Sequence, residues 1–304
     1  IPPMPHLNIF LIAALLFTAN SSSADAPSND PLANYDAQKV SSNTWVVHGP
    51  REFPTPENKG FMNNPVFTVT DNSVVVFDPT SSLQGGIGLL KKIKKITDKP
   101  VTHVFISHVH GDHWLGNQAI KDAYPDTKFY AHPEMIKAAN EGEAANWIAL
   151  MDNLTKGATK GTEAVIPDIA LTDRQEIEID NITVRAYLDE WAHTKSDAMF
   201  VIPEEKVLIT GDNVTYLRIA RMTDGNFQGN IASISKALET EVEIVVPGHG
   251  PTGGKEILGI FKTYLETVYT ASEEAIEEDK EPYEVKAELL PSMEIYHKWS
   301  GFEG

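Results

Sequence analysis

The sequence predicts an α/β protein built as a four-layer αβ/βα sandwich of two similar halves. Three observations carry this prediction. Short apolar segments rich in β-branched residues occur in two series along the chain, helix-like segments accompany each series, and no long linker separates the two. The chain has 304 residues, which suits one large domain or two small ones. We therefore expect residues 27–304 to fold as one domain whose site lies across the edge where two sheets meet.

The first 26 residues are interpreted as a secretory signal peptide. The apolar run Ile9–Phe17 is too short to span a bilayer, and Ala24-Asp25-Ala26 after it matches an A-x-A cleavage pattern. One feature of such signals is missing, because only His6, and no Lys or Arg, precedes the run. We expect a periplasmic or secreted protein with no membrane anchor once this segment is removed.

The first half begins with strands and helices in quick succession. The loop between the first two strands, Pro50 to Pro65, carries Phe53, Phe61 and Met62 among prolines, and these apolar side chains either form a small satellite core or cover the site. Lysines and apolar residues divide between the two faces of the first helix. The expected strands are Thr44–His48, Val66–Thr70, Val74–Asp78, Val101–Ile106 and Lys128–Ala131, and the expected helices are Leu83–Asp98, Asp112 to Tyr124, Pro133–Glu141 and Glu143–Leu154.

The second half repeats this pattern. The last two of the helices above stand between the halves, where they either shape a pocket or pack on the core. Two later helices would cover the second sheet. The expected strands lie at about 169–172, 175–180, 182–188, 198–202, 206–210 and 243–247, and the expected helices are Ile231–Glu239 and Gly254 to about Asp279.

Composition limits the classes of partner. The formal net charge is −18, whereas nucleic acid or an anionic membrane would call for a basic face, so we expect neither as a partner. The chain has no cysteine, which excludes disulfides and thiolate metal ligands. The expected partner is a small-molecule substrate.

The densest chemical signal is the turn Ser107–His113, which follows a strand-like apolar run. Three imidazoles and a carboxylate, those of His108, His110, Asp112 and His113, fall within six positions. Loops at the carboxyl ends of strands are where α/β proteins place ligands. Neutral imidazoles and carboxylates are the ligands that zinc and similar divalent metals prefer. The turn therefore predicts a metal site.

Three isolated residues downstream have the same context. His193, Asp212 and His249 each close an apolar strand, and glycine flanks the last two, where the backbone must turn sharply. The other histidines lack a ligand partner nearby in the sequence, and we expect structural roles for them: His48, His103, His132 and His297.

The ordered pattern H-x-H-x-D-H, isolated His, G-D and P-G-H-G resembles the metallo-β-lactamase superfamily over about residues 40–270. The resemblance implies the metallo-β-lactamase fold and two zinc ions per chain, with iron or manganese as alternatives. It implies one metal on His108, His110 and His193, and a second on Asp112, His113 and His249, with Asp212 bridging them. Asp112 would orient a hydroxide made by the two ions and pass a proton to the leaving group.

The resemblance also bears on the substrate. Having both His113 and Asp212 is more similar to glyoxalase-II-type thioesterases and lactonases than to zinc β-lactamases with a cysteine ligand. In glyoxalase-II-like enzymes a basic residue nine positions after the bridging Asp holds a substrate carboxylate, and that offset falls on Arg221. The alternative is that Arg221 pairs with an acidic neighbour on the surface. Candidate substrate contacts are Arg221, Tyr216, Lys195 and Phe61.

We therefore expect a secreted metal-dependent hydrolase that cleaves an ester, lactone, thioester or β-lactam-type amide in a small anionic substrate. One alternative is an iron-dependent oxidoreductase similar to persulfide dioxygenases, since the same ligand set can hold iron. Another is a phosphodiesterase, which the acidic charge disfavours. A non-catalytic metal-binding module is disfavoured because none of the seven ligands is missing.

Overall fold

This computed structural model describes residues 30–302 of the chain. The predicted signal peptide, residues 1–26, lies outside the described residues. Within residues 30–302, none of the helices is both long enough and apolar enough to span a membrane.

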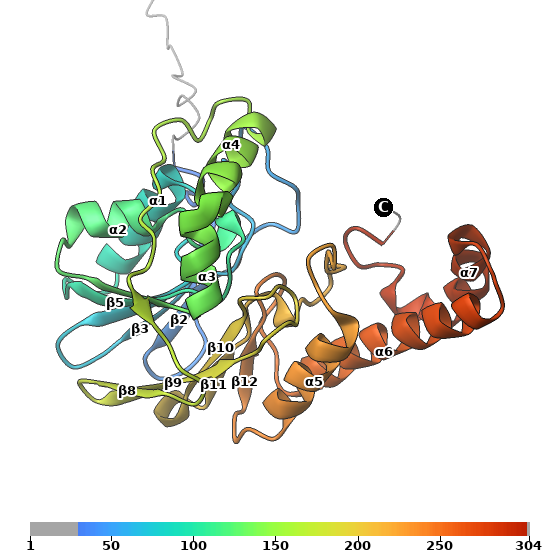
Figure 1. The fold of residues 1–304 in the computed structure, drawn as a ribbon. Helices are drawn as coiled ribbons and strands as arrows, with labels where there is room; N and C mark the ends of the chain where they lie inside the picture. Colours follow the sequence, from blue (N-terminus) through green and yellow to red (C-terminus); the bar gives the residue numbers. More distant parts are fainter. Residues whose placement is uncertain (1–29, 303–304) are drawn as a thin grey trace, which may run out of the picture.

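Two mixed β-sheets form the centre of the molecule (Figure 1). The first has seven strands in sequence order, antiparallel from β1 to β4 and parallel from β4 to β7. The second has five strands in the order β12-β11-β10-β9-β8, of which only β11 and β12 pair in parallel. The strands of the first sheet are β1 Ala37–Lys39, β2 Thr44–Val47, β3 Val66–Val69, β4 Val74–Phe77, β5 Val101–Phe105, β6 Lys128–Ala131 and β7 Ile169–Ala170; those of the second are β8 Glu176–Ile179, β9 Ile182–Leu188, β10 Ala198–Ile202, β11 Val207–Ile209 and β12 Ile244–Val246.

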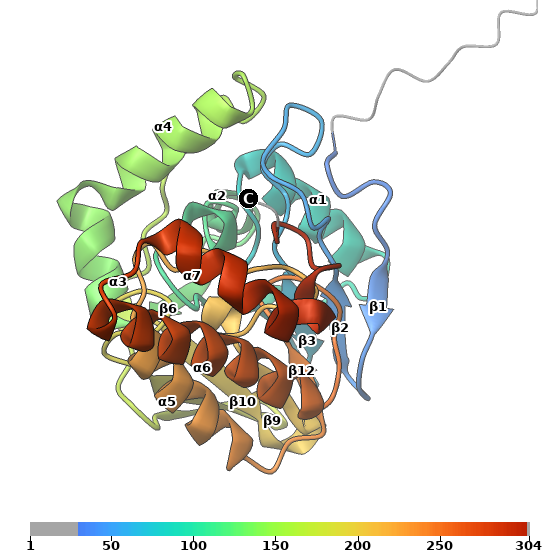
Figure 2. The same ribbon diagram turned by 90° about the vertical axis from the view of Figure 1, so that its right-hand side faces the viewer.

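Helices cover the outer face of each sheet. Figures 1 and 2 show α1 and α2 on the outside of the first sheet and α5 and α6 on the outside of the second. Helices α3 and α4 follow β6 and are joined by a π-turn in which Gly142 has φ 130°. The bounds are α1 Leu83–Lys94, α2 Asn117–Ala123, α3 Pro133–Ala138, α4 Ala144–Leu154, α5 Phe227–Leu238, α6 Glu256–Glu277 and α7 Pro282–Leu289.

Alternate residues of β4 belong to different apolar clusters, which shows how the layers are stacked. Val74 and Val76 belong to the apolar cluster that also contains Leu89 of α1. Val75 and Phe77 belong to the cluster between the two sheets, where the ring of Phe77 lies 5.5 Å from that of Phe200 on β10. A third cluster joins the second sheet to α5 and α6. Because successive side chains of a strand point to opposite faces, β4 is covered on both sides, and the predicted four-layer αβ/βα sandwich is confirmed.

The carboxyl ends of parallel strands meet at one edge of the sandwich. Backbone hydrogen bonds join the two halves there, from Ala198 N to Ser107 O at 2.7 Å and from Asn64 N to Gly248 O at 2.9 Å. Strands β4, β5, β11 and β12 all end at this edge, so the loops that follow them are brought together.

Several element bounds differ from the predicted ones. The sequence did not predict three elements: strand β1, helix α7 and the 3₁₀ segment Leu290–Tyr296 that follows α7. Helix α5 begins four residues before the predicted Ile231, because the Asn226 side chain accepts a hydrogen bond from Gly229 N and caps the helix there. Asp112 and His113 lie in a 3₁₀ turn, Gly111–His113, and α2 begins only at Asn117.

Candidate metal centre

The turn that carries the first four predicted ligands leaves the end of β5. His108 and His113 are fully buried, and only 14% of the His110 side chain is exposed. Gly111 allows close packing, because a Cβ there would lie 2.8 Å from the Cβ of Trp147 on α4. The turn is therefore held between the sheet edge and α4.

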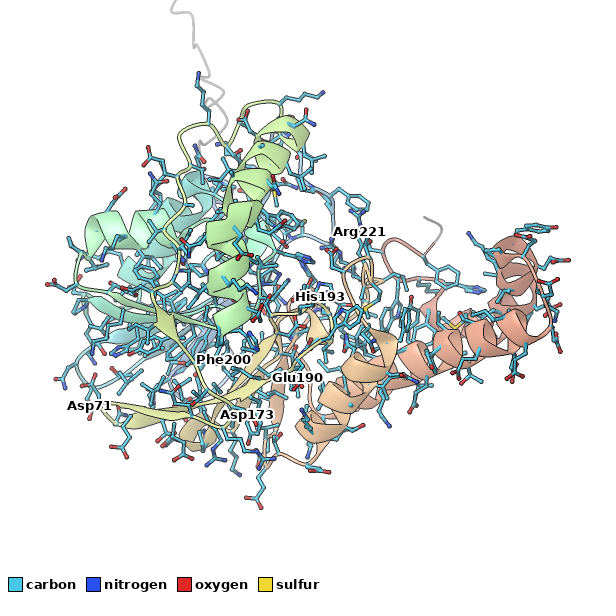
Figure 3. All side chains as sticks on the ribbon, viewed as in Figure 1. Asp71, Asp173, Glu190, His193, Phe200 and Arg221 are labelled. Atoms are coloured by element: carbon cyan, nitrogen blue, oxygen red, sulfur yellow. The ribbon has the colours of Figure 1, made fainter. Side chains whose placement is uncertain are left out.

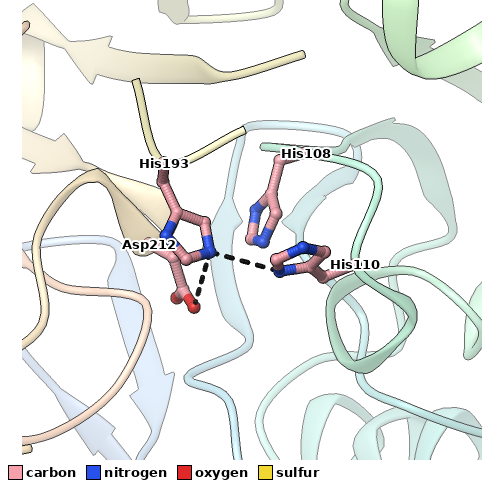
Figure 4. Close-up of side chains that lie close together, drawn as sticks. All are labelled: His108, His110, His193 and Asp212. Carbon is pink, nitrogen blue, oxygen red and sulfur yellow. Dashed lines mark hydrogen bonds and ion pairs between the residues drawn. The ribbon is translucent and has the colours of Figure 1, made fainter. Parts of the chain in front are cut away.

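The first ligand group consists of His108, His110, His193 and Asp212 (Figure 4). Their candidate ligand atoms all lie within 4.8 Å of one another. His193 Nε2 is 3.2 Å from His110 Nδ1 and 3.6 Å from Asp212 Oδ2. The loop after β9 thus brings an imidazole from the second half against two from the first.

The second ligand group consists of Asp112, His113 and His249. Asp112 Oδ2 lies 3.2 Å from His249 Nε2 and 3.5 Å from His113 Nε2. Asp212 also reaches this group, with Oδ1 3.3 Å from His113 Nε2 and Oδ2 3.3 Å from His249 Nε2. A Cβ on Gly248 would clash with Asp212 Oδ1, so glycine is needed beside this carboxylate. Asp212 is therefore in contact with both groups, as a bridging ligand would be.

The hydrogen bonding of the site fits a bound metal. Five buried atoms of the ligand residues have no hydrogen-bond partner among the described residues: His108 Nε2, Asp112 Oδ2, His113 Nε2, His193 Nδ1 and Asp212 Oδ1. Buried polar atoms are normally paired, so a cluster of unpaired donor atoms aimed at common points calls for another partner. Imidazole nitrogens and carboxylate oxygens without thiolate suit zinc, and also iron or manganese.

Asp78 holds two of the histidines from behind. Its Oδ2 accepts hydrogen bonds from His113 Nδ1 at 2.8 Å and from Ser107 Oγ at 2.7 Å. Because Ser107 Oγ donates to Asp78, it accepts from His108 Nδ1 at 2.9 Å, which leaves the lone pair of His108 on Nε2. Carboxylates that orient ligand histidines in this way raise metal affinity. Our sequence reasoning missed Asp78, although it closes the apolar strand β4 just as Asp212 closes β11.

Two other contacts orient the remaining rings. His110 Nε2 donates to Asp224 Oδ2 at 3.1 Å, which leaves Nδ1 facing the first ligand group. His249 Nδ1 donates to Met62 O at 2.8 Å, which leaves Nε2 facing the second. The tautomer of each ring is thus set by a partner outside the ligand groups.

The two groups differ in charge. Burial lowers the pKa of His108, and it lowers the pKa of His193 to about 3, so both rings are neutral near pH 7. Burial would also lower the pKa of His113, but the carboxylates of Asp112, Asp212 and Asp78 outweigh it and hold that pKa well above its ordinary value. Burial and the charge of Arg218 lower the pKa of His249, but the carboxylates of Asp212 and Asp112 outweigh them, so this pKa is raised overall. The pKa of Asp212 is lowered, since the nearby histidines outweigh its burial.

A cavity of about 400 Å³ opens onto the site, and five predicted ligands line it: His110, Asp112, His193, Asp212 and His249. Arg221 also lines the cavity, and Figure 3 shows it near His193. Our sequence reasoning did not single out Arg218, which lines the cavity with its Nη1 2.8 Å from His249 Nδ1. It lies in the same loop as Arg221, but an irregular loop has no periodicity from which to read side-chain direction.

Three predicted substrate contacts do not line the cavity. Phe61 is fully buried in the first apolar cluster and packs its ring 5.3 Å from that of Tyr35, so this side chain belongs to the core. Phe53 and Met62 of the same loop line the cavity, which agrees with the alternative of a cover over the site. The Tyr216 ring turns to Trp299 at 5.7 Å, in the third apolar cluster.

Lys195 points to the surface, where its Nζ lies 4.9 Å from the Trp191 ring. Within residues 30–302, the four histidines outside the site have protein partners, as expected. Their contacts are His48 with Thr252, His103 with Thr102, His132 with Glu134 N and His297 with Leu290 O.

Comparison with known proteins shows which family the chain resembles. The model of the metallo-beta-lactamase superfamily matches residues 59–249. A probable metallo-hydrolase of Streptococcus pyogenes serotype M6 is 27% identical over 199 residues, covering 62% of this chain and 79% of that protein.

More distant relatives are also similar. A linear primary-alkylsulfatase of a Pseudomonas species is 22% identical over 219 residues, or 60% of this chain but only 40% of that enzyme. The solved metallo-beta-lactamase from Pontibacter korlensis superposes with a TM-score of 0.61 at 20% identity, covering 76% of this chain and 99% of that one.

Proposed function

The chain belongs to the metallo-beta-lactamase superfamily and is a metallo-hydrolase, and from this premise we propose that it uses two zinc ions to cleave a small anionic substrate. The bond cleaved is that of an ester, lactone, thioester or β-lactam-type amide. The observation that carries the proposal is the position of Asp212, whose carboxylate oxygens lie 3.3 Å from His113 Nε2 and 3.6 Å from His193 Nε2. One carboxylate in contact with nitrogens of both groups supports two ions close together.

Zinc ions bound to these residues would supply a water of lowered pKa and polarise the bond under attack. Asp112 is a carboxylate that lines the cavity, so it is placed to take the proton of the attacking water and return it to the leaving group. Water oxygen then bonds to the acyl carbon, the bond to the leaving atom breaks, and the proton ends on that atom. His110 and His193 line the cavity beside it and would hold the ion of the first ligand group there.

Arg221 supports an anionic substrate. It lines the cavity, and although its charge contributes to lowering the pKa of Asp224, it forms none of the arginine ion pairs found within residues 30–302, which are those of Arg174 and Arg185. A planar guanidinium can hold a carboxylate by two parallel hydrogen bonds. Replacing Arg221 by Ala should weaken binding of a carboxylate-bearing ester, measured as a raised KM, by about 1.5–3 kcal/mol. The KM of its neutral methyl ester should stay unchanged. Equal effects on both esters would make Arg221 a surface residue.

The test of the function is a substrate panel on the zinc-reconstituted protein. The panel contains a thioester, a lactone, a cephalosporin, an alkyl sulfate and a phosphodiester, and the metal-stripped protein is the control. We expect zinc-dependent turnover of at least one acyl substrate. Cleavage of the phosphodiester alone would favour the phosphodiesterase alternative. Iron-dependent oxygen consumption with a persulfide, without hydrolysis of the panel, would favour the oxidoreductase.

We also propose export to the periplasm or the medium, on the strength of the apolar run and cleavage pattern in residues 1–26. N-terminal sequencing of protein recovered from those fractions should give a chain that begins near Pro27. Recovery from the cytosol with an intact Met4 terminus would contradict it.

A further inference from the structure

The cavity over the metal centre has two unlike walls. The first half of the chain contributes apolar side chains from α4 and from the loop before β3, namely Phe53, Trp147, Leu150, Met151 and Leu154. The second half contributes Arg218 and Arg221, both from the loop that follows Asp212, together with the apolar Ile219 and Ala220 and the acidic Asp224. A cavity with a large apolar side and two arginines next to the ligand groups fits a ligand that has an apolar part and an anionic part.

The apolar wall exposes large side chains to solvent. Phe53 is 62% exposed, Leu150 41% and Leu154 42%. Large apolar side chains gathered at one exposed place mark binding surfaces more often than isolated ones do. All three line the same cavity as the ligands Asp112 and His249, so what they would bind lies beside the metal centre.

Helix α4 is fixed to the metal centre. The Trp147 ring lies 4.9 Å from that of His110, and the Trp147 Cβ packs where Gly111 leaves room. Met151, one turn further along, is 1% exposed and belongs to the first apolar cluster. The wall therefore keeps a constant position relative to the reacting bond.

Arg218 is a cation without an anionic partner. Its Nη1 lies 2.8 Å from His249 Nδ1, but that nitrogen donates to Met62 O and has no lone pair to offer. Its Nη2 reaches the Met62 sulfur at 3.8 Å, and sulfur is a weak acceptor. Within residues 30–302, Arg218 takes part in none of the ion pairs, even though the chain carries a net charge of −18. A half-buried guanidinium in this state is ready to bind an anion.

We propose that the substrate is an amphiphilic anion. Its anionic group is bound by Arg218, beside His249, together with Arg221 of the same loop, and its alkyl or aryl part lies on Phe53, Leu150 and Leu154. This inference rests on the proposed function, because it names the substrate class of the same site. It is tested by binding as well as by turnover, so that the two can fail separately.

The binding test uses n-alkanesulfonates from methane- to octanesulfonate, titrated calorimetrically into the zinc-loaded protein. Their carbon–sulfur bond is not hydrolysed, so affinity is measured without turnover. Each methylene that the wall buries should tighten binding about three- to fourfold. The double variant Leu150→Ser/Leu154→Ser should lose this dependence on chain length and still bind methanesulfonate. Ile87→Ser is the matched control, since Ile87 is 42% exposed on α1 and lies outside the cavity lining.

A second variant tests the contribution of the anionic group separately from that of the alkyl chain. Arg218→Gln should weaken all the sulfonates by a similar factor, about ten- to hundredfold, and leave binding of 1-octanol unchanged. Arg174→Gln, at an arginine outside the cavity, is its control. Circular dichroism confirms the fold of each variant, and the single variant Leu154→Ser replaces the pair if the pair does not fold.

Three results would overturn the inference: affinity independent of chain length in the unmodified protein, full chain-length dependence in the leucine variant, or unchanged affinity in Arg218→Gln. Chain-length-dependent binding by a protein that hydrolyses nothing in the substrate panel would overturn the proposed function and leave this inference standing. Zinc-dependent turnover of a short anionic acyl substrate, together with sulfonate affinity that does not depend on chain length, would overturn this inference and leave the proposed function standing.

Discussion

The first and second ligand groups are built from similar residues but differ in charge. His108 and His193 are buried beside other histidines, so their pKa values are lowered. His113 and His249 are equally buried, yet the carboxylates of Asp112 and Asp212 raise their pKa values. The comparison shows that burial alone does not set the charge of a histidine. Asp212 contacts both groups, so it is the additional carboxylate of Asp112, joined by Asp78 at His113, that lets the second group hold protons when no metal is bound.

Both groups nevertheless depend on the docking of the two halves. Each takes two ligands from the turn after β5; the second half adds His193 and Asp212 to the first group and His249 to the second. The parallel bridge between Thr215 and His249, and the hydrogen bond from Gly248 N to Gly211 O at 2.8 Å, tie the second-half loops together. Neither group can therefore form in one half alone.

The largest effect is expected from Asp112, the one acidic ligand that belongs to the second group alone. Asp112→Asn should lower kcat by about 10²-fold or more, because the side chain both holds an ion and moves the proton. Steady-state kinetics on the substrate found by the panel measures this. An unchanged kcat with only a raised KM would contradict the role assigned to Asp112.

A smaller effect, on the zinc affinity of the second group above all, is expected from replacing Asp78. Asp78→Ala should weaken zinc binding about 10–100-fold, and more at the second group, because Asp78 contacts His113 directly but reaches His108 only through Ser107. Competition with a chromophoric chelator measures both affinities.

Asp180→Ala is the matched control for that prediction. Asp180 also has a positive φ, 52° against 49° for Asp78, and accepts hydrogen bonds from Thr70 and Ser73. Its loss should lower the melting temperature and leave zinc affinity unchanged. If Asp180→Ala weakened zinc binding as much as Asp78→Ala does, the role of Asp78 would be one of general stability.

The smallest expected effect is a difference in the number of protons that the two ligand groups release when each binds its zinc ion. A histidine whose pKa is raised carries a proton at pH values below that pKa, so zinc must displace it, and affinity falls as pH decreases. The second group, with His113 and His249, should therefore lose zinc at a higher pH than the first and release more protons on loading. His193, with a pKa of about 3, adds no such competition near neutrality. Zinc titrations in buffers of different ionisation enthalpy measure the difference, and equal proton release would contradict it.

The seven predicted ligands come together because each lies at the end of a strand, and strand ends are readable from apolar runs. Side-chain direction in irregular loops is not readable in this way. Phe61 and Met62 are neighbours, yet Phe61 turns into the core and Met62 into the cavity. Arg218 and Arg221 differ in the same manner, since only Arg218 contacts a ligand histidine. Helix α7 was missed because none of its residues is buried and no apolar stripe marks it.

The central claim is that one chain binds two ions that share Asp212. Metal analysis of the protein after stripping, zinc reconstitution and removal of free zinc tests it most directly. We expect saturation at two ions per chain in the unmodified protein. Saturation at a single ion would contradict the claim, and the bridging role of Asp212 would have to be abandoned.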